Sequence, residues 1–379
     1  MFSRRQCLQL LSAALPAARA GAQTPLAFPG KRSLLVHNDY PEDLETPVEY
    51  FDTWLTPNDR FFVRQHLPRP RIDAAAWRLD VTGLASTPLK LSLDDLKKLP
   101  QYRVPATLEC AGNGRSNFRP RMPGLQWSKG AIGNAEWRGP RLAGILKSAG
   151  VSNKAAYGNV DGADVGVGKT PDFIRSIPVR KLMHEATILA LEMNGEPLPE
   201  IHGFPARLIV PGWDGASWVK WVTKLDLSEQ PDSGFYFATA YRYPKHPVAP
   251  GVAPKPEEMD VIGGMAVKSI FAKPADQAKL KMVPHTLQGV AWGGENRVVR
   301  VEVSTDAGAK WQDARLSTQD FPFAWRLWSF NWTPAQPGYH LLMSRATDSA
   351  GRIQPIEALW NPSGYLWNSI DRIAVVVEA

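Results

Sequence analysis

Residues 107–115 read Thr-Leu-Glu-Cys-Ala-Gly-Asn-Gly-Arg and place a cysteine, Cys110, just after a run of apolar residues. Residues 104–109 are predicted as a strand, and the small residues that follow allow a ligand to approach the backbone closely. Arg115 can fold back beside the sulfur and favour the thiolate, the form that binds metals or attacks substrates. A buried, inert cysteine with Arg115 in a salt bridge has the same spacing. This stretch alone therefore leaves both interpretations open.

The N-terminal segment makes this cysteine more informative. Within residues 1–22, paired arginines at 4–5 precede a modest apolar stretch at 10–18 and then small residues, which is typical of a twin-arginine export signal. An ordinary secretory signal or a cytoplasmic N-terminus is the alternative. The only other cysteine, Cys7, lies in this segment, so in the periplasm Cys110 could form no intramolecular disulfide. Its thiol would be either buried and inert, or a reactive group or metal ligand.

A second cluster lies nearer the N-terminus. Residues 61–68 read Phe-Phe-Val-Arg-Gln-His-Leu-Pro, and residues 61–64 are predicted as a short apolar strand that ends in charge. Arg64 and His66 then point to the same side of an extended segment. A guanidinium beside an imidazole suits an anionic ligand. A histidine with a purely structural role is the alternative.

A third cluster combines cationic side chains with Gly and Pro turns. Residues 202–212 read His-Gly-Phe-Pro-Ala-Arg-Leu-Ile-Val-Pro-Gly, and residues 217–221 read Ser-Trp-Val-Lys-Trp. His202, Arg207 and Lys220 therefore lie on adjoining predicted strand ends, where they favour a phosphate or another multiply charged anion. The alternative is a solvated rim of strand ends.

A fourth cluster is aromatic. Residues 234–244 read Gly-Phe-Tyr-Phe-Ala-Thr-Ala-Tyr-Arg-Tyr-Pro. Such density is more often core packing than a binding site, but the phenol of Tyr241 could donate a hydrogen bond to an oxyanion.

The pattern along the chain predicts two domains. Residues 30–245 mix short strands with short helices and are predicted as an α+β domain. Residues 246–260 are predicted as a stiff linker, because residues 244–256 hold five prolines. In residues 261–379 apolar and polar residues alternate in strands at the spacing of a β-sandwich, which predicts an all-β, immunoglobulin-like domain.

Composition excludes several classes of protein. The chain is 44% hydrophobic and 21% charged, as in soluble globular proteins, and it carries a formal net charge of +7 without a basic run. No nucleic-acid partner is therefore expected. No apolar run is long enough to span a bilayer, so no membrane insertion is expected. The sequence has no Cys-x-x-Cys-His, no second cysteine beyond the N-terminal segment and no nucleotide-binding fingerprint. Because these motifs are missing, we expect no haem, no iron–sulfur cluster and no flavin in this chain.

Taken together, the four clusters resemble the molybdenum domain of the sulfite oxidase family, in their order and in their separations. The segment that contains Cys110 resembles the metal-ligand segment of that family. Residues 285–292, His-Thr-Leu-Gln-Gly-Val-Ala-Trp, and residues 301–308 resemble its immunoglobulin-like dimerisation domain. The resemblance covers nearly the whole chain beyond the N-terminal segment.

The resemblance implies roles for individual residues. Cys110 would be the thiolate ligand of molybdenum, whose other sulfurs come from a molybdopterin. The substrate oxyanion would meet Arg64, Arg115, Tyr241 and, close by, His66. The cofactor would be bound by Phe62, Arg64, His66, Cys110, Asp161, His202, Arg207, Ser217 and Lys220. Three positions depart from the family pattern: Gln65 replaces a usual Asn, Ser217 an Arg and Tyr236 a Trp.

The same resemblance implies a reaction and its partners. A periplasmic homodimer would oxidise sulfite to sulfate and pass the electrons to an external c-type cytochrome. Two alternatives share the fold, a methionine-sulfoxide-type reductase and a sulfane-sulfur dehydrogenase. Relatives of the latter tend to have Cys-Ser-Gly-Asn where this chain has Cys-Ala-Gly-Asn at 110–113. A periplasmic binding protein without a cofactor is the alternative from another class.

Overall fold

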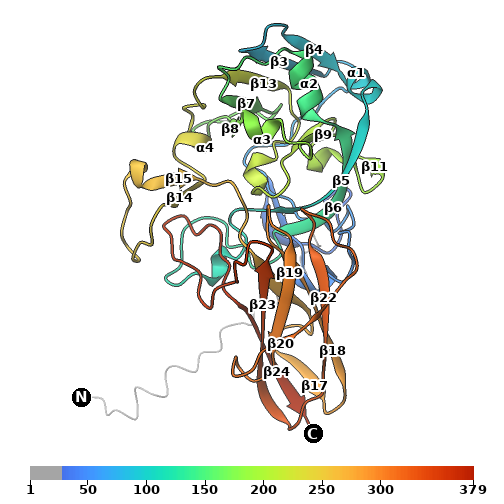
Figure 1. The fold of residues 1–379 in the computed structure, drawn as a ribbon, viewed down its shortest axis with the longest axis vertical. Coiled ribbons are helices and arrows are strands. Elements are labelled where there is room, and N and C mark those ends of the chain that lie inside the picture. The colour runs from blue at the N-terminus through green and yellow to red at the C-terminus, as the bar shows by residue number, and fades with distance from the viewer. Residues whose placement is uncertain (1–27) are drawn as a thin grey trace, which may run out of the picture.

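The computed structural model describes residues 28–379, so the predicted export signal at residues 1–22 lies outside the described residues. Figure 1 shows two parts stacked along the long axis of the molecule. The first two thirds of the chain form a part that mixes helices and strands, and the last third forms an all-β part. This confirms the predicted α+β fold followed by a sandwich. No helix within the described range is long and apolar enough to cross a membrane.

Two sheets organise the first part. One has the strand order β4-β3-β13-β7-β8, in which β13 runs parallel to β3 and the other neighbours are antiparallel. The other has the order β11-β10-β6-β5 and is dominated by the antiparallel pair of β5 and β6. The strands are β3 (Arg78–Gly83), β4 (Leu89–Ser92), β5 (Gln101–Glu109), β6 (Ile132–Pro140), β7 (Tyr157–Asp161), β8 (Arg175–Pro178), β10 (Glu192–Met193), β11 (Glu196–Pro197) and β13 (Lys224–Ser228).

Short helices and smaller strand pairs complete this part. The helices are α1 (Leu93–Lys98), α2 (Leu142–Ser148), α3 (Val179–Leu182) and α4 (Phe235–Ala238). The strand pairs are β1 (Leu35–Asp39) with β2 (Glu42–Glu45), and β9 (Ile188–Ala190) with β12 (Arg207–Ile209). Local signals set the helix ends, because Ser92 and Asp95 form a capping box at α1 and Gly150, with φ +64°, follows α2.

The second part is a sandwich of two sheets. Their strand orders are β16-β18-β22-β21 and β17-β24-β23-β19-β20. The strands are β16 (Lys268–Lys273), β17 (Ala278–Lys281), β18 (His285–Trp292), β19 (Val298–Ser304), β20 (Gln312–Asp313), β21 (Arg315–Leu316), β22 (Arg326–Trp332), β23 (Gly338–Asp348) and β24 (Asp371–Glu378). The inward faces of both sheets supply one buried apolar cluster, which includes Val301, Trp328 and Leu342.

Two local predictions were wrong in detail. Residues 61–64 form no strand, because only Val63 makes an isolated bridge, to Leu44 of β2. Lys220 lies in a loop and not at a strand end, because β13 begins only at Lys224. The proline-rich segment predicted as a linker runs from β14 (Arg242–Pro244) to β15 (Met259–Val261), which pair with each other and close it into a loop.

The two parts pack against each other through a shared apolar cluster. Phe51 and Ile132 of the first part contact Ile270, Trp292 and Trp325 of the second, and all five side chains are buried. Burial of side chains this large makes the interface a hydrophobic core in its own right. The second part therefore supports the end of β5, where Cys110 begins its turn.

Candidate active site

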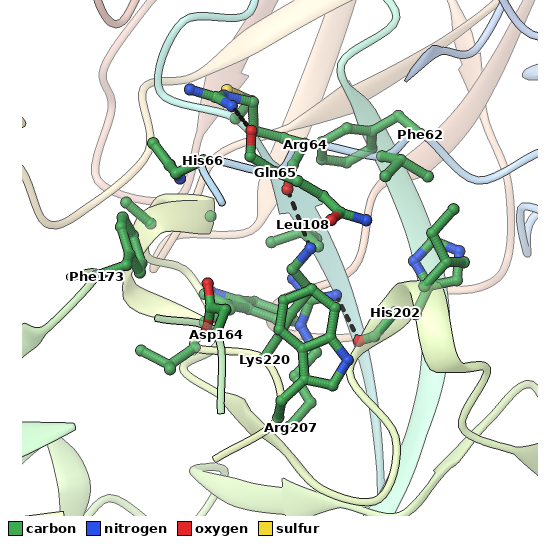
Figure 2. A pocket seen from close by; sticks show the side chains of 18 of the residues that line it. Phe62, Arg64, Gln65, His66, Leu108, Asp164, Phe173, His202, Arg207 and Lys220 are labelled. Carbon is green, nitrogen blue, oxygen red and sulfur yellow. Dashed lines mark hydrogen bonds between the residues drawn. The ribbon is translucent and has the colours of Figure 1, made fainter. Parts of the chain in front are cut away.

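A pocket opens in the first part between the end of β5, residues 62–66 and the turns on either side of β12 (Figure 2). Its empty volume is about 700 Å³. Eight of the side chains singled out in the sequence line it: Phe62, Arg64, His66, Cys110, His202, Arg207, Lys220 and Tyr241. The four sequence clusters thus meet in one place, although they are spread over nearly half of the chain.

The Cys110 turn is fixed by backbone hydrogen bonds. The Cys110 amide donates to Ala131 O at 2.9 Å, and Asn113 N donates to Cys110 O at 2.9 Å. Gly114 has φ +87°, a conformation that favours glycine, and an added Cβ there would lie 2.5 Å from the Trp367 ring. The cysteine is 9% exposed and its side chain faces the pocket. The small residues of the turn therefore let the chain reverse while the sulfur stays accessible from one side.

The protonation of this thiol depends on two opposing effects. Burial raises the pKa of the Cys110 thiol, and Arg64, the Gly112 amide and Arg115 only partly oppose it. Arg115 does favour the thiolate, but in the protein without a ligand the desolvation of the sulfur outweighs the nearby positive charge. A bound metal ion would deprotonate the thiol directly.

We call Cys110, Arg64, His66 and Tyr241 the sulfur end of the pocket. His66 Nε2 lies 2.5 Å from Tyr241 Oη, and the imidazole stacks on Phe173 with ring centroids 4.4 Å apart. Burial, followed by repulsion from Arg64, lowers the pKa of His66 well below its usual value, so the ring is neutral. Burial raises the pKa of Tyr241 well above its usual value, so the phenol keeps its proton.

Arg64 provides the positive charge of the sulfur end. One of its terminal nitrogens, NH1, contacts Asp43 Oδ1 at 3.1 Å and the Gln65 carbonyl. Burial acts to lower the pKa of Arg64, but attraction to Asp43, Tyr241 and Cys110 and the hydrogen bond to Asp43 together outweigh it, so the net shift is upward. The guanidinium therefore stays charged inside the pocket.

We call His202, Arg207 and Lys220 the cationic end of the pocket. Arg207 NH1 donates to His202 O at 3.1 Å, and Lys220 Nζ donates to Arg64 O at 3.2 Å (Figure 2). Burial lowers the pKa of Arg207 to about 9 and, together with repulsion from Arg207, that of Lys220 to about 7. Behind them Lys31 Nζ lies 2.5 Å from His202 Nε2. Burial also lowers the pKa of His202 and that of Lys31 well below their usual values, so the imidazole is neutral and the lysine and arginine side chains beside it repel one another.

Three of the predicted site residues do not line the pocket. Arg115 lies behind the cysteine turn, where Nε donates to Ser363 O at 3.1 Å and NH1 to Leu125 O at 3.0 Å. The Ser217 hydroxyl donates to Asp214 at 3.1 Å. Asp161 ends β7, and burial followed by repulsion from nearby aspartates raises its pKa to about 6.

The second part of the chain also reaches this turn. Leu366 N donates to Ala111 O at 2.9 Å, and the Arg115 guanidinium lies over the Tyr365 ring at 5.0 Å. Tyr365 in turn stacks on Tyr241 with ring centroids 5.5 Å apart. The residues around Cys110 are thus held from both parts of the molecule.

Sequence reasoning missed several residues of the site. Asp164 and Phe173 line the pocket, and burial raises the pKa of Asp164 to about 6. Arg175 is buried, donates to the Tyr236 carbonyl and lies 5.0 Å from the Tyr241 ring. The only signal for Arg175 was a charged residue at the start of an apolar strand. That signal is too common to single the residue out.

The residues present fit a polar, anionic cofactor. Both amide atoms of Gln65 and the Nε of Arg207 are buried without a hydrogen-bond partner anywhere in residues 28–379. Buried polar groups in folded proteins nearly always have partners, so these atoms fit a ligand rich in donors and acceptors. The cationic end would hold a phosphate, and Cys110 offers a soft sulfur ligand for a metal.

The geometry agrees with what is found in known proteins. Residues 66–236 match the family described as an oxidoreductase molybdopterin binding domain, and residues 259–378 match a Mo-co oxidoreductase dimerisation domain. Mitochondrial sulfite oxidase of Mus musculus is 34% identical over 97% of this chain and 69% of its own. The Homo sapiens protein of the same name is 36% identical over 94% of this chain and 68% of its own.

A solved structure supports the same assignment. The sulfane dehydrogenase SoxCD from Paracoccus pantotrophus has a TM-score of 0.79 and 28% identity, and the match covers 98% of both chains. The predicted resemblance is thereby confirmed, and a binding protein without a cofactor is excluded. The chain belongs to the sulfite oxidase family and is a molybdenum-dependent oxidoreductase with a molybdopterin cofactor.

Proposed function

We propose that the protein oxidises sulfite to sulfate at the molybdenum–molybdopterin centre and passes the electrons to an external c-type cytochrome. One observation carries this proposal: a single thiol shares a pocket wall with a charged guanidinium and a neutral histidine–tyrosine pair. These are the groups that a small sulfur oxyanion needs beside a redox metal. When bound, the molybdenum supplies two-electron oxidation and oxygen transfer at sulfur.

Arg64 would hold the substrate oxyanion. Within residues 28–379, its guanidinium donates hydrogen bonds only through NH1. The remaining N–H groups can therefore point at a ligand. Asp43 fixes the orientation of this planar group before the substrate arrives. A fixed, buried guanidinium binds a sulfur oxyanion without reorganising during the reaction.

The His66–Tyr241 pair would exchange one proton with the substrate. With a neutral imidazole and a protonated phenol 2.5 Å apart, the pair can donate to a sulfite oxygen and can accept a proton at His66 Nε2. Phe173 packs on the imidazole and fixes its plane. Both substrate protonation states present near neutral pH could therefore bind.

The cationic end would hold the pterin and its phosphate. Burial of the Arg207 charge without a paired carboxylate is costly, and a phosphate would offset that cost. Asp164, at the pocket wall, would be an acceptor for pterin ring N–H groups, whereas the sequence had suggested Asp161 as a cofactor-binding residue. The cofactor would then lie between His202 and Cys110.

Assembly and location are part of the same proposal. The match to a dimerisation domain over residues 259–378 supports a homodimer. The arginine pair at residues 4–5 supports export to the periplasm by the twin-arginine route.

Oxidation of a sulfane sulfur is the second candidate. The similarity to SoxCD over 98% of both chains favours it. Against it stands Ala111, where relatives with that activity tend to have Ser. The pocket residues named above would serve either substrate.

The test is an assay of cytochrome c reduction with sulfite as the electron donor, run beside Cys110→Ser. We expect sulfite-dependent reduction by the natural protein and a loss of more than about 100-fold in the variant, since a serine oxygen is a poor substitute for a soft thiolate. A thiosulfate or protein-persulfide donor that outperforms sulfite would favour the second candidate. Activity in the variant that equals the natural activity would contradict the role of Cys110.

A further inference from the structure

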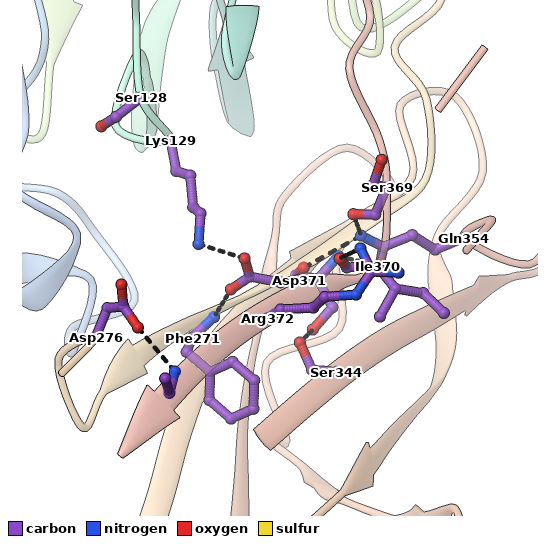
Figure 3. A network of polar contacts seen from close by, with 12 residues as sticks. Ser128, Lys129, Phe271, Asp276, Ser344, Gln354, Ser369, Ile370, Asp371 and Arg372 are labelled. Carbon is purple, nitrogen blue, oxygen red and sulfur yellow. Dashed lines mark hydrogen bonds and ion pairs between the residues drawn. The ribbon is translucent and has the colours of Figure 1, made fainter. Parts of the chain in front are cut away.

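Two ion pairs, one fully buried and one partly buried, join the two parts of the chain beside the cysteine turn. Lys268, the first residue of β16, pairs with Glu109, the last residue of β5, and their side chains are only 2% and 4% exposed. Lys129, which precedes β6, pairs with Asp371, the first residue of β24 (Figure 3). Each part thus contributes one lysine and one carboxylate.

Glu109 is adjacent to Cys110 in the chain and is held at both oxygens. Oε1 accepts from Lys268 and, at 3.1 Å, from Asn113 Nδ2, while Oε2 accepts from Trp292 Nε1 at 2.9 Å. Asn113 also accepts from Ala131 N at 3.1 Å through its own side-chain oxygen. The carboxylate is therefore the centre of a network that ties both ends of the cysteine turn to the second part.

The second pair holds the other side of the same turn. Lys129 lies two residues before Ala131, whose carbonyl accepts from the Cys110 amide at 2.9 Å. Its partner Asp371 accepts from Phe271 N at 2.8 Å (Figure 3). Phe271 and Lys268 both belong to β16, so this one strand connects the two pairs.

We propose that Lys268 is a positioning residue for the metal site. It holds Glu109, and Glu109 in turn fixes the position of the Cys110 sulfur. This rests on the proposed role of Cys110 as the metal ligand. A structural interface alone would need only the apolar cluster around Trp292 and Trp325. A buried charge pair beside the ligand adds a fixed direction, since both partners lose their hydrogen bonds if the turn moves.

The experiment compares three full-length variants with the natural enzyme, all loaded with cofactor. Lys268→Met removes the cation. Glu109→Gln removes the charge and keeps the shape, but its amide NH2 group cannot accept from the donors that now bind both carboxylate oxygens. The double variant with both changes leaves no unpaired charge. Lys181→Met is the control, because Lys181 is 7% exposed and also bridges the two parts, at 2.5 Å from the half-exposed Glu295, while its side chain bonds to Pro211 O and not to the cysteine turn.

We expect Lys268→Met to lower kcat by about 10- to 100-fold per bound molybdenum, the usual effect of losing an outer partner of a metal ligand. KM should stay nearly unchanged, and the paramagnetic resonance spectrum of the one-electron-reduced metal should shift. The double variant should recover the melting temperature, because no unpaired charge is left, but not kcat or the spectrum, because the pair that holds the turn is still missing. Lys181→Met should lower the melting temperature but leave kcat and the spectrum unchanged.

The result that would overturn the proposal is a Lys268→Met enzyme with natural kcat and spectrum per molybdenum, whatever its melting temperature. If that variant fails to fold, the double variant decides in the same way, since it leaves no unpaired charge. Failure of the proposed function itself would look different, because the natural enzyme would then lack sulfite oxidation or Cys110→Ser would retain it.

Discussion

The two ends of the pocket differ in how far their positive charge is balanced by negative charge. At the sulfur end, Arg64 is paired with Asp43, and His66 and Tyr241 are both neutral. At the cationic end, burial lowers the pKa of Arg207 to about 9 and that of Lys220 to about 7, with Asp164 as the main nearby opposing charge. A balanced end suits a small ligand that must arrive and leave. An unbalanced end suits an anion that stays bound.

The largest expected effect tests the unbalanced end. Arg207→Met should lower the molybdenum content of purified protein by about 100-fold, because the anchor of the cofactor phosphate is lost. The same change should raise the melting temperature of cofactor-free protein, since a buried, unpaired charge disappears. Metal analysis and thermal unfolding measure the two quantities. A variant with full molybdenum content would contradict the view that the cationic end binds the cofactor.

The next effect tests the balanced end. Arg64→Gln should lower kcat/KM for sulfite by about 30-fold or more per bound molybdenum, because a buried charged donor to the oxyanion is lost. Molybdenum content should fall much less than in Arg207→Met. Steady-state kinetics normalised to metal content measure kcat/KM, and metal analysis measures the molybdenum content. Equal loss of metal in both variants would mean that the two ends are not distinct.

A smaller effect concerns the phenol. Tyr241→Phe removes one hydrogen-bond donor from the sulfur end and should reduce kcat/KM by about 10-fold. Because His66 Nε2 then has no partner in the pair, the pH profile of kcat/KM should also change shape. A pH series with the natural enzyme as the reference measures this. If the variant and the natural enzyme have the same pH profile of kcat/KM, the His66–Tyr241 pair does not exchange a proton with the substrate.

The smallest effect is a pH dependence of stability without cofactor. Burial raises the pKa of Asp161 and Asp164 to about 6 and lowers that of Lys220 to about 7. The raised carboxyl pKa values reduce stability as pH rises from about 4 to 6, and the lowered lysine pKa restores it above about 7. We expect a shallow stability minimum between these ranges. Thermal unfolding across pH should show it, and the minimum should weaken once cofactor is bound.

The sequence predicted the fold and most of the pocket for one physical reason. Strand ends and Gly or Pro turns are local signals, and the clusters around Cys110, Arg64 and His202 lie on them. The strand predicted at 61–64 failed because apolar composition does not decide whether a neighbouring strand is available for pairing.

What the sequence could not predict depends on contacts between distant segments. Arg115 is close to Cys110 in sequence, yet its guanidinium turns toward Ser363, which belongs to the other part of the chain. Asp164 and Lys31 carry no motif of their own. The pair between Glu109 and Lys268 joins residues that are 159 positions apart, and no local pattern relates them.

The contacts from residues 363–367 have a consequence for biosynthesis. Leu366 donates to Ala111 O, and Ser363 accepts from Arg115, so the turn that bears Cys110 takes its final shape only with these late residues in place. During translation the ribosome releases them long after the first part has emerged. Insertion of the cofactor should therefore follow the completion of synthesis, and a nascent chain stalled before residue 363 should not retain molybdenum.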